Sequence, residues 1–137
     1  MPESMITEHE IEVRVRYQET DGQARVHHAN YLTYFEMART EMLRASGTTY
    51  RDFEETGLML VVAEVKVLYY LPADYDDLLR VRVQTTKAKG ARVYQSYEVS
   101  RGEEVLATGE SVLACVDRSG RVTRLPTWLR SDGQRSE

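Results

Sequence analysis

The chain has 137 residues, of which 42% are hydrophobic and 29% are charged, and its formal net charge is −4 at pH 7. A chain of this length and composition is typical of one globular domain. We place that domain at residues 1–137, with a core from about residue 9 to residue 126. The negative charge argues against a nucleic-acid partner, which would require a net basic face.

The sequence also bears on the cellular compartment. Cys115 is the only cysteine, so no intrachain disulfide can form. The first ten residues have neither the basic start nor the apolar run of a secretory signal. No stretch approaches the roughly 20 apolar residues that a membrane-spanning helix needs. We therefore expect a cytoplasmic protein without a membrane span.

The first half of the chain changes its hydrophobic period at Asn30. Residues 9–17 alternate apolar and polar side chains, which predicts a half-buried strand, and residues 18–29 form a turn. From Asn30 the apolar residues recur at helical spacing. We predict a helix of about 16 residues, near 24 Å long, with Asn30 as its N-cap and Gly47 as its stop.

The second half reads as a succession of strands. A short helix is expected over 50–56, and the predicted strands are 58–70, 78–87, 93–101, 104–116 and a short last one near Val122. The tail after Pro126 is expected to be flexible and to fray. This order predicts an α+β architecture, in which a curved antiparallel sheet of five or six strands wraps one long central helix.

Two details of the strands refine this prediction. Three small residues fall on one face of the 104–116 strand and would let the helix approach closely, namely Ala107, Gly109 and Ser111. The 58–70 strand is apolar on both faces, interrupted only by Glu64 and Lys66. Apolar residues on both faces of a strand indicate association with another subunit.

The segment from Tyr17 to Tyr31 contains the candidate catalytic residues. It brings a carboxylate, Asp21, through a turn and ends with His28 at the start of the predicted helix. A helix start offers unpaired backbone N–H groups and a partial positive charge. A carboxylate beside such an oxyanion site can hydrolyse an activated acyl group. A thioester suits it, because its thiol leaving group has a pKa near 8.5 and has little need of a general acid.

The chain from Ile11 to Pro126 resembles the hotdog-fold thioesterases, in particular the 4-hydroxybenzoyl-CoA thioesterase group and its short-chain acyl-CoA relatives associated with the Tol–Pal system. The resemblance rests on blocks in the same order, namely Tyr17, Glu19-Thr-Asp21, Val26, His28-Ala-Asn30-Tyr31, Glu36-Met-Ala-Arg39, Glu41-Met-Leu-Arg44, Tyr70-Leu-Pro-Ala, Asp77-Leu-Leu and Cys115-Val-Asp, followed by Gly120 and Pro126.

The resemblance implies the hotdog fold and hydrolysis of an acyl-CoA to a free acid and coenzyme A, without a cofactor. It further implies Asp21 as nucleophile or general base and the backbone N–H of His28 as the oxyanion donor. It also implies a homo-oligomer, either a dimer or a dimer of dimers (a homotetramer), with its sites at the subunit interface.

The sequence departs from the family pattern just after Asp21. A customary glycine is replaced by Ala24, and a usually apolar position is occupied by Arg25. If that glycine has φ > 0, an alanine would disturb the loop. We expect Arg25 to contact substrate and to alter which acyl chain is accepted.

Each candidate residue also has a purely structural interpretation. Asp21 can cap the turn, His28 can be a junction histidine, and Asn30 and Tyr31 can serve as helix cap and core residue. The remaining substrate-binding candidates are Glu64, across a dimer interface, and a basic hairpin that would meet the phosphates of coenzyme A, made of Lys87, Lys89 and Arg92. A solvated strand face and a solvated turn are the alternatives for these.

Other chemistries lack their motifs. There is no Gly-x-Ser-x-Gly elbow, and the adjacent His27 and His28 do not have the spacing of a helical zinc site, so no metal is expected. The main alternative to an enzyme is a hotdog module that binds acyl-CoA or an acyl carrier protein without turnover. Hydration of an enoyl thioester is a further alternative, although its usual Asp/His pairing is not visible.

Overall fold

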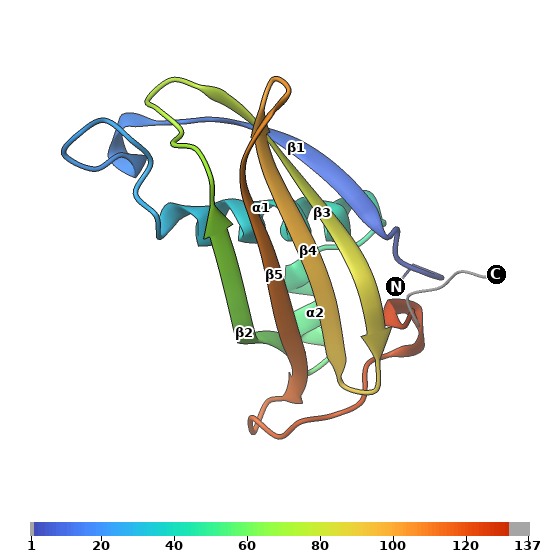
Figure 1. Cartoon of the computed structure of the whole chain (residues 1–137). Coiled ribbons are helices and arrows are strands. Elements are labelled where there is room, and N and C mark those ends of the chain that lie inside the picture. The colour runs from blue at the N-terminus through green and yellow to red at the C-terminus, as the bar shows by residue number, and fades with distance from the viewer. Residues whose placement is uncertain (1, 132–137) are drawn as a thin grey trace.

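The computed structural model describes residues 2–131, in which five strands form one antiparallel sheet in the order β1-β3-β4-β5-β2 (Figure 1). The strands are β1 (Glu8–Arg14), β2 (Leu58–Tyr69), β3 (Leu78–Lys89), β4 (Arg92–Arg101) and β5 (Glu104–Asp117). The helices are α1 (Asn30–Ala45) and α2 (Tyr50–Glu55), and two 3₁₀ turns lie at Tyr17–Glu19 and Thr127–Leu129. The predicted α+β architecture is confirmed.

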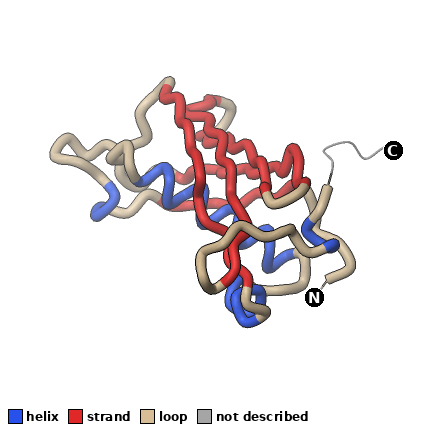
Figure 2. The backbone as a smooth tube through the Cα atoms, turned by 90° about the horizontal axis from the view of Figure 1, so that it is seen from below, coloured by secondary structure: helices blue, strands red, loops and turns tan. Residues whose placement is uncertain are grey.

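The two helices cover the same face of the curved sheet (Figure 2). Phe35 of α1 stacks on Tyr97 of β4, with ring centroids 4.3 Å apart. A Cβ atom at Gly109 would lie 2.4 Å from the Phe35 ring, so glycine is required where helix and sheet meet. The close approach expected at this face of β5 is therefore confirmed. Phe53 of α2 belongs to a second cluster with Leu113 and Cys115.

The start of α1 differs from the prediction. The N-cap residue is Ala29, which offers no side-chain hydrogen bond, and Asn30 is the first helical residue. The Asn30 side-chain amide instead donates to the Glu19 carbonyl oxygen at 2.9 Å. The predicted end is confirmed, because Gly47 follows the helix at φ 106°, a conformation that favours glycine.

The strand and tail boundaries also need correction. The first strand ends at Arg14, because Tyr17–Glu19 turns into a 3₁₀ helix. Val122 forms only an isolated bridge with Val116, and no strand is described there. Leu129 is buried and Ser131 bridges to Ala88, so the chain is packed up to residue 131 instead of fraying after Pro126. The rest of the expected flexible tail, 132–137, lies outside the described residues.

β2 is an edge strand and is left largely uncovered. Its pairing to β5 is interrupted by a bulge between Val62 and Glu64. Large apolar side chains on both of its faces are exposed, namely Val61, Val62, Val65, Leu68 and Tyr69. A long edge of this kind is a template for pairing with another strand. Within residues 2–131, no helix is long and apolar enough to cross a membrane.

Candidate active site

The loop between β1 and α1 is held against the loop between β2 and β3. The Val26 N–H donates to the Ala73 carbonyl oxygen at 2.8 Å, and the Tyr75 N–H donates to the Ala24 carbonyl oxygen at 3.0 Å. Backbone bonds fix a loop without using its side chains. The contact between the two loops therefore does not depend on the Asp21 side chain.

Glu19 anchors this loop from inside, a role that the sequence pattern did not reveal. Its carboxylate is 5% exposed and accepts hydrogen bonds from the Tyr34 hydroxyl (2.8 Å), the Arg16 N–H (2.9 Å) and the Arg16 guanidinium (2.9 Å). Burial alone would raise the pKa of Glu19, but these bonds and the Arg16 charge lower that pKa below its ordinary value. An ionised Glu19 thus joins the loop to α1.

Asp21 lies exposed in the turn that Glu19 anchors. Its Oδ1 accepts hydrogen bonds from the Gln23 N–H at 2.8 Å and from the Arg25 N–H at 3.3 Å. The bond from Gln23 is the largest cause that lowers the pKa of Asp21, so the carboxylate is ionised at neutral pH. Its Oδ2 accepts no hydrogen bond from any described residue. Asp21 therefore caps the turn with one oxygen and keeps the other available.

The peptide groups around His28 are almost fully bonded. The His27 carbonyl oxygen accepts from the Asn30 N–H at 2.9 Å, and the Ala29 N–H donates to His27 Nδ1 at 3.2 Å. The His28 carbonyl oxygen accepts from the Tyr69 hydroxyl at 3.0 Å. The His28 N–H has no acceptor among the described residues. This free donor precedes α1, where the helix dipole favours a negative charge.

The two departures from the family pattern sit in the same turn. Ala24 adopts φ 66°, a left-handed conformation that favours glycine. Arg25 is exposed, its carbonyl oxygen accepts from the Asp21 N–H at 2.7 Å, and its charge contributes to the lowered pKa of Asp21. Arg25 therefore lies beside the carboxylate without forming an ion pair with it.

Two other predicted site residues, Tyr31 and Glu64, differ in their exposure to solvent. Tyr31 is a buried core residue whose ring packs edge-on against Tyr34 and Tyr69. Glu64 is exposed on the edge strand β2.

The basic hairpin is remote from Asp21 within one chain. β3 begins at Leu78, beside the loop that holds the Asp21 turn, and runs twelve residues to Lys89. At the rise of a strand this is about 36 Å. Lys87 packs over the Tyr94 ring at 5.5 Å, and Lys89 and Arg92 are exposed at the hairpin. One chain alone does not bring these cations to the carboxylate.

No group of three or more His, Cys, Asp or Glu side chains in residues 2–131 is arranged to hold a metal ion.

Sequence reasoning missed Tyr69 as well as Glu19. Tyr69 closes a strand and bonds a residue 41 positions earlier, and a pattern read along the chain carries no signal for such a contact.

Two bacterial proteins with similar sequences are both named as acyl-CoA thioesterases. The acyl-CoA thioesterase YbgC of Haemophilus influenzae is 39% identical over 106 residues, which is 77% of this chain and 78% of that protein. The acyl-CoA thioester hydrolase YbgC of Escherichia coli is 35% identical over 106 residues, which is 77% of this chain and 79% of that protein.

Solved structures agree in fold. The crystal structure of a probable thioesterase from Bartonella henselae superposes with a TM-score of 0.82 at 31% identity, covering 87% of this chain and 99% of that one. A DHNA-CoA thioesterase from Staphylococcus aureus gives a TM-score of 0.82 at 28% identity, covering 88% and 82%. The sequence model of the thioesterase-like superfamily matches residues 15–132 of this chain. This protein therefore belongs to the thioesterase-like superfamily and has its hotdog fold.

Proposed function

We propose that this protein hydrolyses acyl-CoA thioesters to a free acid and coenzyme A. The observation that carries the proposal is the junction between β1 and α1. It presents an ionised, exposed Asp21 with one unpartnered oxygen and a His28 N–H without an acceptor among the described residues. The relatives named as acyl-CoA thioesterases support the same substrate class.

The chemistry follows from these two groups. The His28 N–H donates a hydrogen bond to the thioester oxygen as negative charge develops there, helped by the α1 dipole. Asp21 either attacks the carbonyl carbon, giving an anhydride that water then hydrolyses, or takes a proton from a water that attacks instead. In both routes the C–S bond breaks, and coenzyme A leaves as a thiolate that takes up a proton. Asp21 is regenerated in both.

We further propose that the active form is a homodimer joined along β2, with a dimer of dimers as the next level of assembly. The exposed apolar side chains on both faces of β2 support this pairing. A two-fold axis pairs β2 with itself in antiparallel fashion, so the Leu58 end of one copy lies beside the Tyr69 end of the other. Glu64, near the middle of β2, then lies at the interface.

Antiparallel pairing also gives the basic hairpin a role. It moves Lys87, Lys89 and Arg92 of one copy to the end of the joined sheet that carries Asp21 of the other copy. Cations at that position suit the phosphates of coenzyme A. Lys89→Ala with Arg92→Ala should then raise KM for acyl-CoA severalfold and leave kcat nearly unchanged. An unchanged KM would remove the hairpin from the site.

The experiment that tests the proposed function measures coenzyme A release from acyl-CoAs of two to sixteen carbons. Sedimentation of the same protein at micromolar concentration is measured in parallel. The proposal expects turnover and at least a dimer. Binding of acyl-CoA without release of coenzyme A would favour the binding module instead. Sedimentation as a monomer would contradict the assembly.

A further inference from the structure

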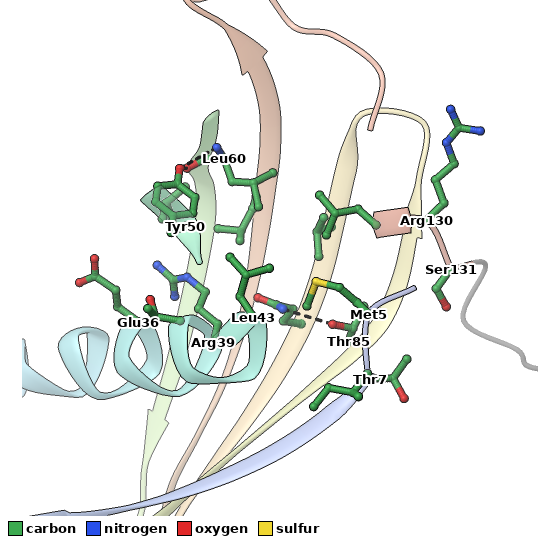
Figure 3. Close-up of a pocket in the computed structure, with 17 residues that line it drawn as sticks. Met5, Thr7, Glu36, Arg39, Leu43, Tyr50, Leu60, Thr85, Arg130 and Ser131 are labelled. Atoms are coloured by element: carbon green, nitrogen blue, oxygen red, sulfur yellow. Dashed lines mark hydrogen bonds between the residues drawn. The ribbon is translucent and has the colours of Figure 1, made fainter. Parts of the chain in front are cut away.

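A cavity of about 240 Å³ lies between α1, α2 and the sheet, at the end of the molecule away from the Asp21 loop (Figure 3). Most of its wall is apolar and is made by Leu43, Leu60, Val93 and Leu113. Thr85 and Gln95 add polar atoms from the sheet. A mainly apolar cavity with a few convergent polar groups is the usual form of a small-molecule site.

Two arginines that form no ion pair with a described residue line this cavity, Arg39 and Arg130, and the Arg130 side chain points away from it (Figure 3). Arg39 extends from α1 toward Tyr50 (Figure 3). Its only hydrogen bond to a described residue goes from Nη1 to the Tyr97 hydroxyl at 3.3 Å. No described residue forms an ion pair with Arg39. A guanidinium has five N–H donors in a planar fork, so most of the Arg39 donors have no partner among residues 2–131.

A buried hydrogen-bond network supports Arg39 without supplying a negative charge. The Tyr97 hydroxyl donates to Gln95 Oε1 at 3.1 Å and bonds Ser111 Oγ at 2.7 Å, and Gln95 Nε2 donates to Thr85 Oγ1 at 3.2 Å. Tyr97, Gln95 and Ser111 are all buried. Each of these groups is satisfied within the network, so none of them supplies a negative charge to Arg39.

We propose that this cavity binds a carboxylate carried on a short apolar body, with the carboxylate on the Arg39 guanidinium and the apolar body against Leu43, Leu60 and Leu113. A carboxylate matches the planar fork of arginine and forms charge-assisted hydrogen bonds with it. The cavity volume limits the apolar body to a small acid.

The negative charge of Glu36 would weaken binding of this ligand, which provides a second variant for testing the proposal. It lies one turn before Arg39 on α1, lines the same cavity, and forms no ion pair with a described residue. A carboxylate held on Arg39 would be repelled by Glu36. Removing the Glu36 charge should therefore strengthen binding, whereas removing the Arg39 charge should weaken it.

The test is calorimetric titration of the full chain with hexanoate and with the uncharged hexanamide. Wild type should bind hexanoate about tenfold more tightly than hexanamide. Arg39→Gln should reduce this preference to about twofold or less, and Glu36→Gln should strengthen hexanoate binding about threefold. Arg44→Gln is the matched control, because Arg44 is on the same helix and paired with Glu41. Thermal melts check that Arg39→Gln folds, and Glu36→Gln removes no hydrogen bond or ion pair to a described residue.

Equal binding of hexanoate and hexanamide would overturn the proposal. So would a preference that Arg44→Gln removes as fully as Arg39→Gln, or a hexanoate affinity that Glu36→Gln leaves unchanged. The titration requires no turnover, so it stands or fails separately from the proposed hydrolysis.

The carboxylate can belong to a free acid or to the far end of an acyl group on coenzyme A. The ratio of adipoyl-CoA to hexanoyl-CoA turnover distinguishes these sources. If Arg39→Gln lowers this ratio at least fivefold, the carboxylate belongs to the acyl group of a thioester held by a second copy. An unchanged ratio beside a hexanoate preference that depends on Arg39 identifies a free acid.

Discussion

The Tyr69 hydroxyl donates a hydrogen bond to the His28 carbonyl oxygen at 3.0 Å, which ties the last residue of β2 to the start of α1. The two rings also meet edge-on, with centroids 6.5 Å apart. Because the peptide on the other side of His28 is held by Asn30, this bond helps to fix the direction of the free His28 N–H. The edge strand therefore supports the proposed oxyanion donor.

Replacing Tyr69 tests this support. Tyr69→Phe removes the hydroxyl and keeps the ring, so kcat for the best acyl-CoA should fall by about 2–10-fold, which corresponds to one hydrogen bond of about 0.5–1.5 kcal/mol. Tyr70→Phe is the control, since among residues 2–131 the Tyr70 hydroxyl bonds only Thr108, away from His28. Steady-state kinetics on both variants give the comparison. Equal losses in the two variants would argue against a positioning role for Tyr69.

Ala24 is held in a conformation that favours glycine. Its φ of 66° carries a steric cost for a residue with a Cβ atom. Ala24→Gly should therefore raise the free energy of unfolding by about 0.5–1 kcal/mol, measured by chemical denaturation. The control is Gly22→Ala in the same turn, where φ is not left-handed and a Cβ meets nothing within 4 Å, and it should be tolerated. A less stable Ala24→Gly would contradict the strain.

Glu19 should make stability depend on pH. Its folded pKa lies below its ordinary value of 4.5, so its contribution is fully present above that value and is lost as pH falls through the folded pKa. Glu19→Gln should lower the free energy of unfolding by about 1–3 kcal/mol at pH 7. The gap between wild type and variant should narrow as pH falls from 7 to below the ordinary pKa of a glutamate and then below the folded pKa of Glu19. A gap that is constant across this range would mean that the Glu19 charge is not what stabilises the loop.

Arg25 should influence the choice of acyl chain. Its positively charged guanidinium lies beside Asp21, where it disfavours a long apolar chain. Arg25→Val should raise kcat/KM for medium aliphatic acyl-CoAs relative to short or polar ones, and Arg25→Lys should keep the wild-type ratio. If the ratio across chain lengths is the same in all three proteins, Arg25 lies outside the acyl site.

The fold could be predicted because each element has a clear period. Alternation gave β1 and β3, and the helical spacing from Tyr31 onward gave α1 with its end at Gly47. The prediction failed where a long-range contact decides the outcome. Asn30 bonds a carbonyl eleven residues earlier instead of capping its own helix, and Leu129 is buried although the tail after Pro126 is polar apart from Trp128 and Leu129.

The site was predicted only as far as it is local in sequence. Asp21 and His28 are seven positions apart and share one junction, so their neighbourhood follows from the motif. Glu19 and Tyr69 support that junction through contacts with Tyr34 and His28 across the fold. The basic hairpin is distant in one chain, and a single sequence does not say how two copies pair.

The measurement that tests the central claim most directly is coenzyme A release by Asp21→Asn, with the best acyl-CoA found for wild type. The asparagine side-chain oxygen can still accept the Gln23 N–H, so the turn should persist while the nucleophile or base is lost. We predict a rate lower by about 10²–10⁴-fold with binding retained, and a smaller loss for His28→Ala, whose backbone donor remains. A rate for Asp21→Asn within a few-fold of wild type would contradict the mechanism.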